Sequence, residues 1–233
     1  MAKKTNDTFI RCNGEIVPCF QSDFCITSSP VWVSDDMSGK MRGIPSVSTS
    51  CLVNPFCLAR MKNKEAICAR CFAESQQKKY KASREHAIAN YHLLNDEILP
   101  LEVLPLFGNV RKVRIESFGD LGSVIHAVNY LNMIIKNPAI GFTWWTKNHN
   151  FVIQAIEKYF GGVKPKNLIL VASSLKVNKA AKLPKYFDKV FTVYDDEFIT
   201  ENGIDINCGS RFCMGCMRCY GECDEVEVRE RLK

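Results

Sequence analysis

Short apolar or aromatic runs alternate along this chain with segments of helical period, and this alternation most limits the possible folds. Helical connections between successive strands imply parallel pairing with right-handed crossovers. We therefore expect an α/β fold, either an open doubly wound sheet or a barrel. The predicted strands are 46–51, 110–117, 140–146, 167–173, 189–194 and 204–207, and the predicted helices are 84–99, 123–136 and 150–160.

Twelve cysteines are present among the 233 residues, and most of them fall into two dense groups. The chain begins MAKKTNDTF without an apolar signal segment, and no apolar run approaches the ~20 residues of a membrane span, so we expect a reducing cytoplasm. There, dense thiols indicate metal ligands before disulfides. The first group is Cys51, Cys57, Cys68 and Cys71, and the second is Cys208, Cys213, Cys216, Cys219 and Cys223.

The spacing of the second group, C-x2-C-x2-C-x3-C from Cys213, is typical of bacterial ferredoxins and predicts an iron–sulfur cluster. Either Cys208 or Cys223 can be its fourth ligand, and Arg211 and Arg218 can offset its negative charge. The first group, C-x5-C-x10-C-x2-C, suits iron–sulfur or zinc equally well. The remaining thiols could supply a missing ligand, form a third site or be ordinary buried cysteines: Cys12, Cys19 and Cys25.

Polar or cysteine residues follow every predicted strand. Because the carboxyl ends of parallel strands meet at one edge, where ligands bind, we expect both cysteine groups and these polar residues to share that edge. Any single polar strand end can alternatively be an ordinary solvated loop without a function. The polar residues are Glu116, Ser117 and Asp120, then Thr146, Lys147 and Asn148, then Ser173 and Ser174, then Tyr194, Asp195 and Asp196.

The net charge of +6 is unevenly placed. Residues 58–84 carry eight basic side chains against two acidic ones. Such a stretch can attract a nucleic acid or another phosphate-bearing partner, or it can be a solvated helix face.

Four sequence blocks resemble the phage gene-product-88 family over roughly residues 45–220. They are SVSTSCLVNPFCLARMKNKEAICARCFA at 46–73, RIESFGDL at 114–121, NYLNMIIKNP at 129–138 and WTKN at 145–148. More remotely, the layout is similar to the radical S-adenosylmethionine superfamily.

The remote resemblance implies a partial (β/α)6 barrel of parallel strands with cysteine-rich metal-binding segments at both ends. Residues 1–45 would be an irregular extension, 46–207 the barrel with its cluster loop at 51–71, and 208–233 a tail that binds an auxiliary cluster. Three cysteines of such enzymes bind a [4Fe–4S] cluster and leave one iron open for S-adenosylmethionine, which is cleaved to a 5′-deoxyadenosyl radical. Here Cys57, Cys68 and Cys71 would be these ligands, with Cys51 a spare or fourth.

In such an enzyme the polar strand ends would bind the cofactor, through Glu116, Ser117, Asp120, Lys147 and Asn148. An electron donor would be a partner, and a phage protein would work in the host cytoplasm. Two other functions are compatible with the sequence. One is a non-catalytic iron–sulfur or zinc protein that binds nucleic acid through 58–84 or a host protein, and the other is an electron carrier.

Overall fold

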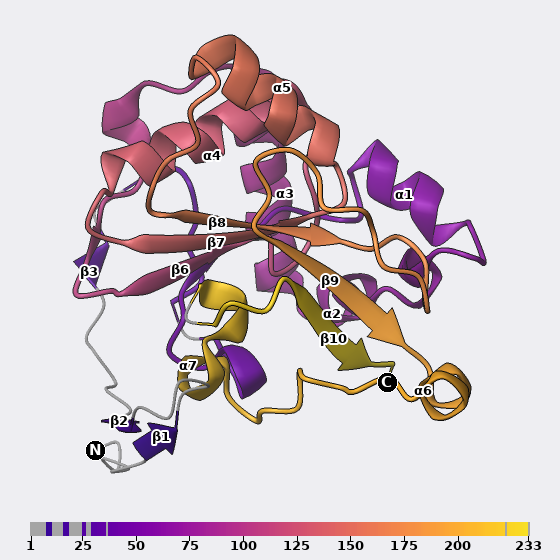
Figure 1. Ribbon diagram of the computed structural model, residues 1–233. Coiled ribbons are helices and arrows are strands. Elements are labelled where there is room, and N and C mark those ends of the chain that lie inside the picture. The colour runs from indigo at the N-terminus through magenta and orange to yellow at the C-terminus, as the bar shows by residue number, and fades with distance from the viewer. Residues whose placement is uncertain are drawn as a thin grey trace.

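A computed structural model describes residues 8–10, 16–18, 25–26, 29–35, 37–221 and 223–232. Its centre is a six-stranded sheet in the order β10-β9-β8-β7-β6-β4, in which all neighbouring strands are parallel (Figure 1). The strands are β4 (Ser46–Val47), β6 (Lys112–Ile115), β7 (Gly141–Thr146), β8 (Leu168–Ser173), β9 (Lys189–Tyr194) and β10 (Glu227–Arg231).

The strands stand side by side in the order in which the chain makes them. This order lacks the reversal that defines a doubly wound sheet. The two edge strands, β4 and β10, are not paired with each other in the described part of the chain. The fold is therefore a mixed α/β structure with an open parallel sheet, and closure into a barrel is not confirmed.

The predicted sixth strand at 204–207 is wrong, because the last strand of the sheet is β10. The Asn207 side chain accepts from the Arg229 N–H at 2.8 Å and donates to the Glu227 carbonyl at 2.9 Å. These side-chain bonds replace a strand ladder at this position. The second cysteine group consequently lies between β9 and β10 in the chain, and a predicted tail at 208–233 contains a strand of the main sheet.

Three longer helices lie on one side of the sheet: α3 (Lys81–Asp96), α4 (Val124–Lys136) and α5 (His149–Tyr159) (Figure 1). The Ser123 side chain caps α4 by accepting from the His126 N–H at 3.1 Å, and α5 ends just before Gly161, whose φ is +59°. Helix α4 buries Leu131 and Ile134 against β6 and β7. This helix-covered face holds the larger hydrophobic core.

The opposite face of the sheet is covered by the C-terminal segment. Alternate side chains of a strand point to opposite faces, so Trp144 packs under the helices while Trp145 joins a second, smaller core with Val171 and Tyr220. Two short elements of the C-terminal segment lie here, α7 (Cys213–Cys216) and η4 (Arg218–Tyr220). Because none of the three longer helices covers it, this side is called the open face below.

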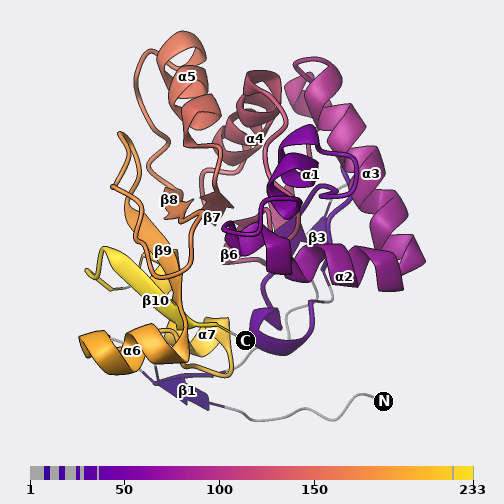
Figure 2. The same ribbon diagram turned by 90° about the vertical axis from the view of Figure 1, so that its right-hand side faces the viewer.

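The remaining elements are short. Helices α1 (Pro55–Met61) and α2 (Phe72–Lys79) with η2 (Ile67–Arg70) lie at the carboxyl edge of the sheet, and α6 (Asp196–Asn202) follows β9 (Figure 2). The others are η1 (Gly39–Met41), η3 (Leu101–Val103), the antiparallel pair β1 (Thr8–Ile10) and β2 (Ile16–Pro18), and the antiparallel pair β3 (Cys25–Ile26) and β5 (Phe107–Gly108). No helix among the described residues is long and apolar enough to cross a membrane.

Candidate metal centre

The first cysteine group lies at the carboxyl edge of the sheet, in the segment between β4 and α3. Cys57 is in α1, Cys68 is in η2 and Cys71 directly precedes α2. Cys51 and Cys57 are buried, whereas Cys68 and Cys71 are half-buried. Each thiol affects the ionisation of at least one other member. The segment thus brings four sulfurs into one neighbourhood.

The turn that carries Cys51 is held by the fully buried side chain of Gln77. Its Nε2 donates to the Thr49 carbonyl at 3.1 Å, and its Oε1 accepts from the Ser50 hydroxyl at 2.8 Å. The Cys51 thiol donates to the same Oε1 at 3.6 Å. Gln77 therefore connects α2 to the turn after β4 and fixes Cys51.

Cys71 is the thiol of this group that most readily becomes an anion. The Cys51 thiol donates a hydrogen bond to it, and the N–H groups of Ala73 and Glu74 at the start of α2 do the same. These interactions and the charge of Lys147 outweigh burial and lower the pKa of Cys71 to about 6. Donating that hydrogen bond raises the pKa of Cys51 strongly, so Cys51 keeps its proton.

Lys147 supplies the positive charge of the first group. It directly follows β7, and its ammonium interacts with the charges of Cys68, Asp120, Cys57 and Cys71. Burial lowers the pKa of Lys147, but these negative charges outweigh burial and raise it. Its ammonium has no carboxylate within 4.0 Å among the described residues. Asp120 and the Cys71 thiolate supply compensating charge, and Cys57 and Cys68 would add to it as thiolates.

Loop 116–121 supports the group from beneath. Asn54 caps α1 by accepting from the Phe56 N–H at 3.0 Å and donates Nδ2 to the Asp120 carbonyl at 2.7 Å. Gly119 has φ of +81°, and a Cβ there would stand 2.4 Å from the Thr49 carbonyl oxygen. Only glycine allows this loop to approach the turn after β4 so closely.

Of the five residues expected to bind a cofactor, four are engaged in hydrogen bonds within the protein. Glu116 accepts from the Thr49 N–H and hydroxyl at 3.1 and 2.8 Å and from the Tyr130 hydroxyl at 2.9 Å. The Asp120 carboxylate accepts from the Thr146 hydroxyl and from the N–H groups of Lys147 and Leu121. Ser117 bonds Ser46 and Ser48, and Asn148 donates to the Leu121 carbonyl. Of the five side chains, that of Lys147 faces the thiols.

The residues after β9 also serve the fold. The Tyr194 hydroxyl donates to Glu227 at 2.7 Å, and Asp195 caps α6 by accepting from the Phe198 N–H at 2.9 Å. Asp196 lies 3.3 Å from Arg231. This turn joins β9 to β10 and α6.

The second cysteine group lies against the open face of the sheet instead of at its carboxyl edge. Cys213 and Cys216 begin and end α7, and Cys219 is in η4. Cys208 reaches them beside β10, where its N–H donates to the Arg229 carbonyl at 3.0 Å. These four thiols affect one another's ionisation. The expectation that both groups share one edge is therefore not met.

Cys223, the other cysteine predicted for the second group, does not join these four thiols. Cys223 is disulfide-bonded, which leaves Cys208 as the free thiol beside Cys213, Cys216 and Cys219. Cys12 and Cys19 lie outside the described residues, as does the side chain of Cys25.

Arg114 is the main cation at the second group. It extends from β6 onto the open face, where its guanidinium carbon lies 3.9 Å from the centre of the Trp145 ring. Its Nη1 lies 3.4 Å from the Met41 sulfur, and its buried Nε has no hydrogen-bond partner. Burial raises the pKa of Cys213 and Cys219, and the positive charge of Arg114 opposes that rise.

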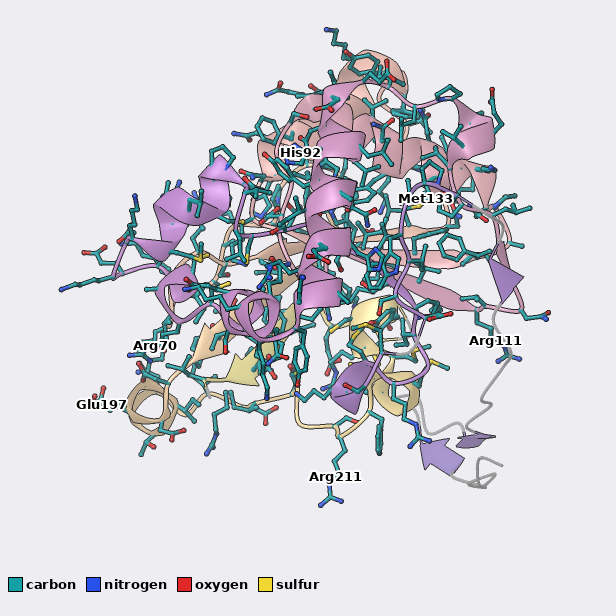
Figure 3. The ribbon with its side chains drawn as sticks, turned by 180° about the vertical axis from the view of Figure 1, so that it is seen from behind. Arg70, His92, Arg111, Met133, Glu197 and Arg211 are labelled. Atoms are coloured by element: carbon teal, nitrogen blue, oxygen red, sulfur yellow. The ribbon has the colours of Figure 1, made fainter. Side chains whose placement is uncertain are left out.

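Lys40 is the second cation here, with its ammonium 3.9 Å from the Cys208 sulfur and 2.8 Å from a Glu230 oxygen. The two arginines expected in this role differ. Arg211 is exposed and points away from the ribbon (Figure 3). Arg218 pairs with Glu225 at 2.6 Å and donates to the carbonyl of Asn207, the residue before Cys208.

The donor sets suit a thiolate-bound metal. Thiolates select iron–sulfur clusters, zinc and copper(I), and a metal removes the proton from a coordinating thiol. The buried Nε atom of Arg114, which has no hydrogen-bond partner, marks a positive charge beside the thiols of Cys213 and Cys219, and thiolates there would neutralise it. Within 29–35, 37–221 and 223–232, no three His, Cys, Asp or Glu side chains are arranged as ligands of a single ion.

Sequence reasoning missed the residues that support the two groups. Gln77 sits in a charged helix, and nothing in its sequence context distinguishes it from an exposed glutamine. Arg114 belongs to a strand with two other basic residues, Arg111 and Lys112, and the alternation of side chains could have placed it opposite Val113 and Ile115. His126, whose sequence context shows no ligand spacing, has its Nε2 3.6 Å from a carboxylate oxygen of Glu116.

Comparison with known proteins gives a family but no characterised relative. A family model described as gene product 88 matches residues 19–225. Searches of curated proteins and of solved structures each found no match to the chain.

Proposed function

We propose that this chain, which belongs to the gene product 88 family, is an iron–sulfur protein with two cluster sites. Thiolates are the ligands that hold [4Fe–4S] clusters. The first site is formed by Cys51, Cys57, Cys68 and Cys71, and the second by Cys208, Cys213, Cys216 and Cys219.

The observation that carries this proposal is the unpaired charge of Arg114. The half-buried Arg114 guanidinium stays charged, and leaving it without an anion is destabilising. Among the described residues, no carboxylate lies within 4.0 Å of Arg114, and the acidic groups that its charge affects are the Tyr220 hydroxyl and the thiols of Cys213 and Cys219. Burial keeps those thiols protonated, so a metal that converts them to thiolates would supply the missing negative charge.

The first site supports the proposal in the same way through Lys147. Its ammonium faces four thiols, three of which have pKa values raised chiefly by hydrogen bonding or burial. Zinc bound by four thiolates would satisfy both cations equally well. The metal must therefore be identified by measurement.

The test is anaerobic purification followed by iron, sulfide and zinc analysis with absorption spectra. We expect a brown protein with equal amounts of iron and sulfide, and two distinguishable signals when the protein is reduced. Colourless protein that contains zinc alone would refute the iron–sulfur assignment.

Paired substitutions assign the two sites. Cys68→Ser with Cys71→Ser should remove the first cluster, and Cys213→Ser with Cys216→Ser should remove the second. The control is Cys223→Ser, which should keep both clusters because Cys223 lies outside the free thiols. Loss of iron in the control would contradict the assignment of Cys208 as the fourth ligand.

A catalytic role of the radical S-adenosylmethionine type is the second candidate. It is supported by the chain-ordered parallel strands and by the position of the first cysteine group directly after the first strand of that sheet. When bound, such a cluster supplies reductive cleavage of S-adenosylmethionine. In this role Cys57, Cys68 and Cys71 would be the three ligands, and Cys51, whose sulfur lies 3.6 Å from the Gln77 Oε1, would be the spare thiol.

In that role, the protein's own residues would orient the cofactor and exclude water. Lys147 could pair with a cofactor carboxylate at the site, because its ammonium faces the thiols. Glu116 and Asp120 already accept hydrogen bonds from the protein, so their part is to hold the loops that surround the site.

The test is to reduce the reconstituted protein, add S-adenosylmethionine, and measure 5′-deoxyadenosine and the change in the cluster's magnetic resonance spectrum. Product is expected from the unaltered chain and from Cys51→Ala, but not from Cys57→Ala. An intact cluster that gives no product and no spectral change would exclude this activity and leave a closed-site iron–sulfur protein.

A further inference from the structure

Residues 58–84 form a basic surface on the segment that carries the first cysteine group, and we call it the 58–84 surface. It comprises the end of α1, η2, α2 and the start of α3 (Figure 2). Arg70, which lies between Cys68 and Cys71, is exposed on it (Figure 3). The exposed basic residues are Lys62, Lys64, Arg70, Lys78, Lys79 and Lys81.

Only part of this positive charge is neutralised within the protein. Lys78 pairs with Glu74 at 2.7 Å, and Lys81 approaches Glu85 at 3.7 Å. The other acidic residue of the surface, Glu65, is bound at 2.7 Å by Lys176 from outside it. Among the described residues, no carboxylate lies within 4.0 Å of the ammonium groups of Lys62, Lys64 and Lys79. These three lysines are available to an anionic partner.

Aromatic rings are exposed among these cations. Phe72 is 67% exposed, follows Cys71 directly and stacks on Phe118 with ring centres 6.2 Å apart. Tyr80 is 50% exposed at the other end of α2, and the Lys79 ammonium lies 5.3 Å from its ring centre. The two rings are separated by about 12 Å of helix. Both rings are therefore accessible to a partner.

We propose that the 58–84 surface binds single-stranded nucleic acid. The lysines would contact the phosphate backbone, while Phe72 and Tyr80 would stack on bases. Cationic grooves with exposed aromatic rings are the usual means of binding single strands without strict sequence preference. The proposal does not depend on which metal the nearby thiols hold.

The aromatic rings distinguish this partner from an acidic protein. An acidic surface would need the positive charge but would gain little from two rings set between lysines. A duplex would hide its bases from Phe72 and Tyr80. The ring contribution is therefore the specific part of the proposal.

The experiment is a titration of the full chain, as purified with its metal, into fluorescein-labelled dT20 and U20, followed by anisotropy between 50 and 300 mM salt. The charge variant combines Lys62→Gln, Lys64→Gln and Lys79→Gln. Each phosphate contact on a single strand contributes about 0.7 to the slope of log affinity against log salt, so the slope should fall by about 2. A matched control removes three lysines far from the surface: Lys158→Gln, Lys166→Gln and Lys182→Gln.

The ring variants test the stacking. Phe72→Ala and Tyr80→Ala should each weaken binding about tenfold, and Phe72→Trp should retain it. Iron and zinc contents of Phe72→Ala are measured in parallel, because its neighbour Cys71 is a proposed ligand.

Three results would overturn the proposal. The first is no binding of either oligonucleotide at 50 mM salt. The second is an equal loss of oligonucleotide affinity in the charge variant and in the lysine control. The third is unchanged affinity in both alanine variants together with equal binding of heparin, which would indicate a polyanion or acidic-protein surface instead.

Discussion

Single buried residues carry most of the unusual electrostatics of this protein. Arg114 and Lys147 place a positive charge beside each cysteine group, and both lack a close carboxylate among the described residues. Glu116 places an acid in the core, with a left-handed backbone at φ of +57° and three hydrogen-bond donors around it. Unpaired charges and strained backbone lower the free energy of unfolding. The effect of each position can therefore be measured with a single substitution.

Replacing Arg114 with methionine should have opposite effects in the two metal states. In metal-free protein, the change removes a buried charge without an anion, so the free energy of unfolding should rise by about 1–3 kcal/mol. In metal-loaded protein, the same change removes the partner of the thiolates and should lower stability and metal content. Denaturant titration of both forms checks this, and a change of the same sign in both would contradict it.

The stability contributed by Glu116 should fall as pH rises. Burial is the main cause that raises its pKa to about 8 from an ordinary value of 4.5, so the folded protein keeps a proton that the unfolded chain loses. Between pH 4.5 and 8, this costs up to about 1.4 kcal/mol per pH unit. Glu116→Gln mimics the protonated acid. Its free energy of unfolding should therefore rise relative to that of the unaltered chain as pH increases across that window.

The measurement is the difference in unfolding free energy between the two proteins at several pH values, which cancels other titrating groups. His126 should not distort it above about pH 7.5, because burial lowers its folded-state pKa to about 3 and the unfolded chain's histidine is also largely neutral there. If the two plots of unfolding free energy against pH run parallel from pH 5 to 8, Glu116 is ionised in the folded protein and the prediction is wrong.

At the level of elements, the segment from α1 to α2 is held by a few contacts. Its helices are seven and eight residues long, which is too short for stability without tertiary contacts. Gln77 and Asn54 tie it to the turn after β4 and to loop 116–121, and the Ile67 N–H donates to the Leu175 carbonyl at 2.8 Å. In the proposed loaded state, the metal-bound thiols would add a further anchor. The 58–84 surface is built on this segment.

Removing the metal with a chelator should therefore loosen 55–80 before the rest of the fold. We expect faster amide hydrogen exchange in α1, η2 and α2, with little change in α4 and β7, which lie in the main core. Mass spectrometry of exchanged peptides measures this. Uniform acceleration across all peptides would indicate that the metal stabilises the whole fold instead.

Elements were predictable from sequence where burial gives a clear pattern. The strands at 140–146 and 189–194 are apolar enough to be recognised, whereas β10 reads EVRER and buries only Val228. Charged residues protect an edge strand from pairing with other chains, and they also hide it from hydrophobic patterning. The segment 204–207 alternates like a strand, but the Asn207 side chain takes the hydrogen bonds.

For the whole molecule, the two faces of the sheet separate the two cysteine groups. The strand ends correctly indicated the carboxyl edge for the first group. The second group could not be placed from sequence, because its position depends on β10 returning to the sheet after Cys219. Sequence spacing fixes which thiols can meet, but not the surface against which they meet.

Deleting residues 224–233 should damage the whole fold and not only a tail. The deletion removes five parallel backbone pairings with β9 and the bond between Tyr194 and Glu227. It also removes the Arg229 carbonyl that holds Cys208. We expect a lower melting temperature, aggregation through the bared β9 edge and loss of the second metal. A soluble truncated protein with unchanged melting temperature would show that β10 is dispensable.

The chain order of the strands has a consequence for how the protein is made. During synthesis, each new strand can dock beside the one that the ribosome has just released, without waiting for a distant partner. The surface that receives Cys213–Cys219 is complete once β8 and β9 are in place, before β10 has emerged. The second group is therefore enclosed only when β10 joins the sheet. Docking of residues 224–233 would thus be the step that completes the proposed second cluster site.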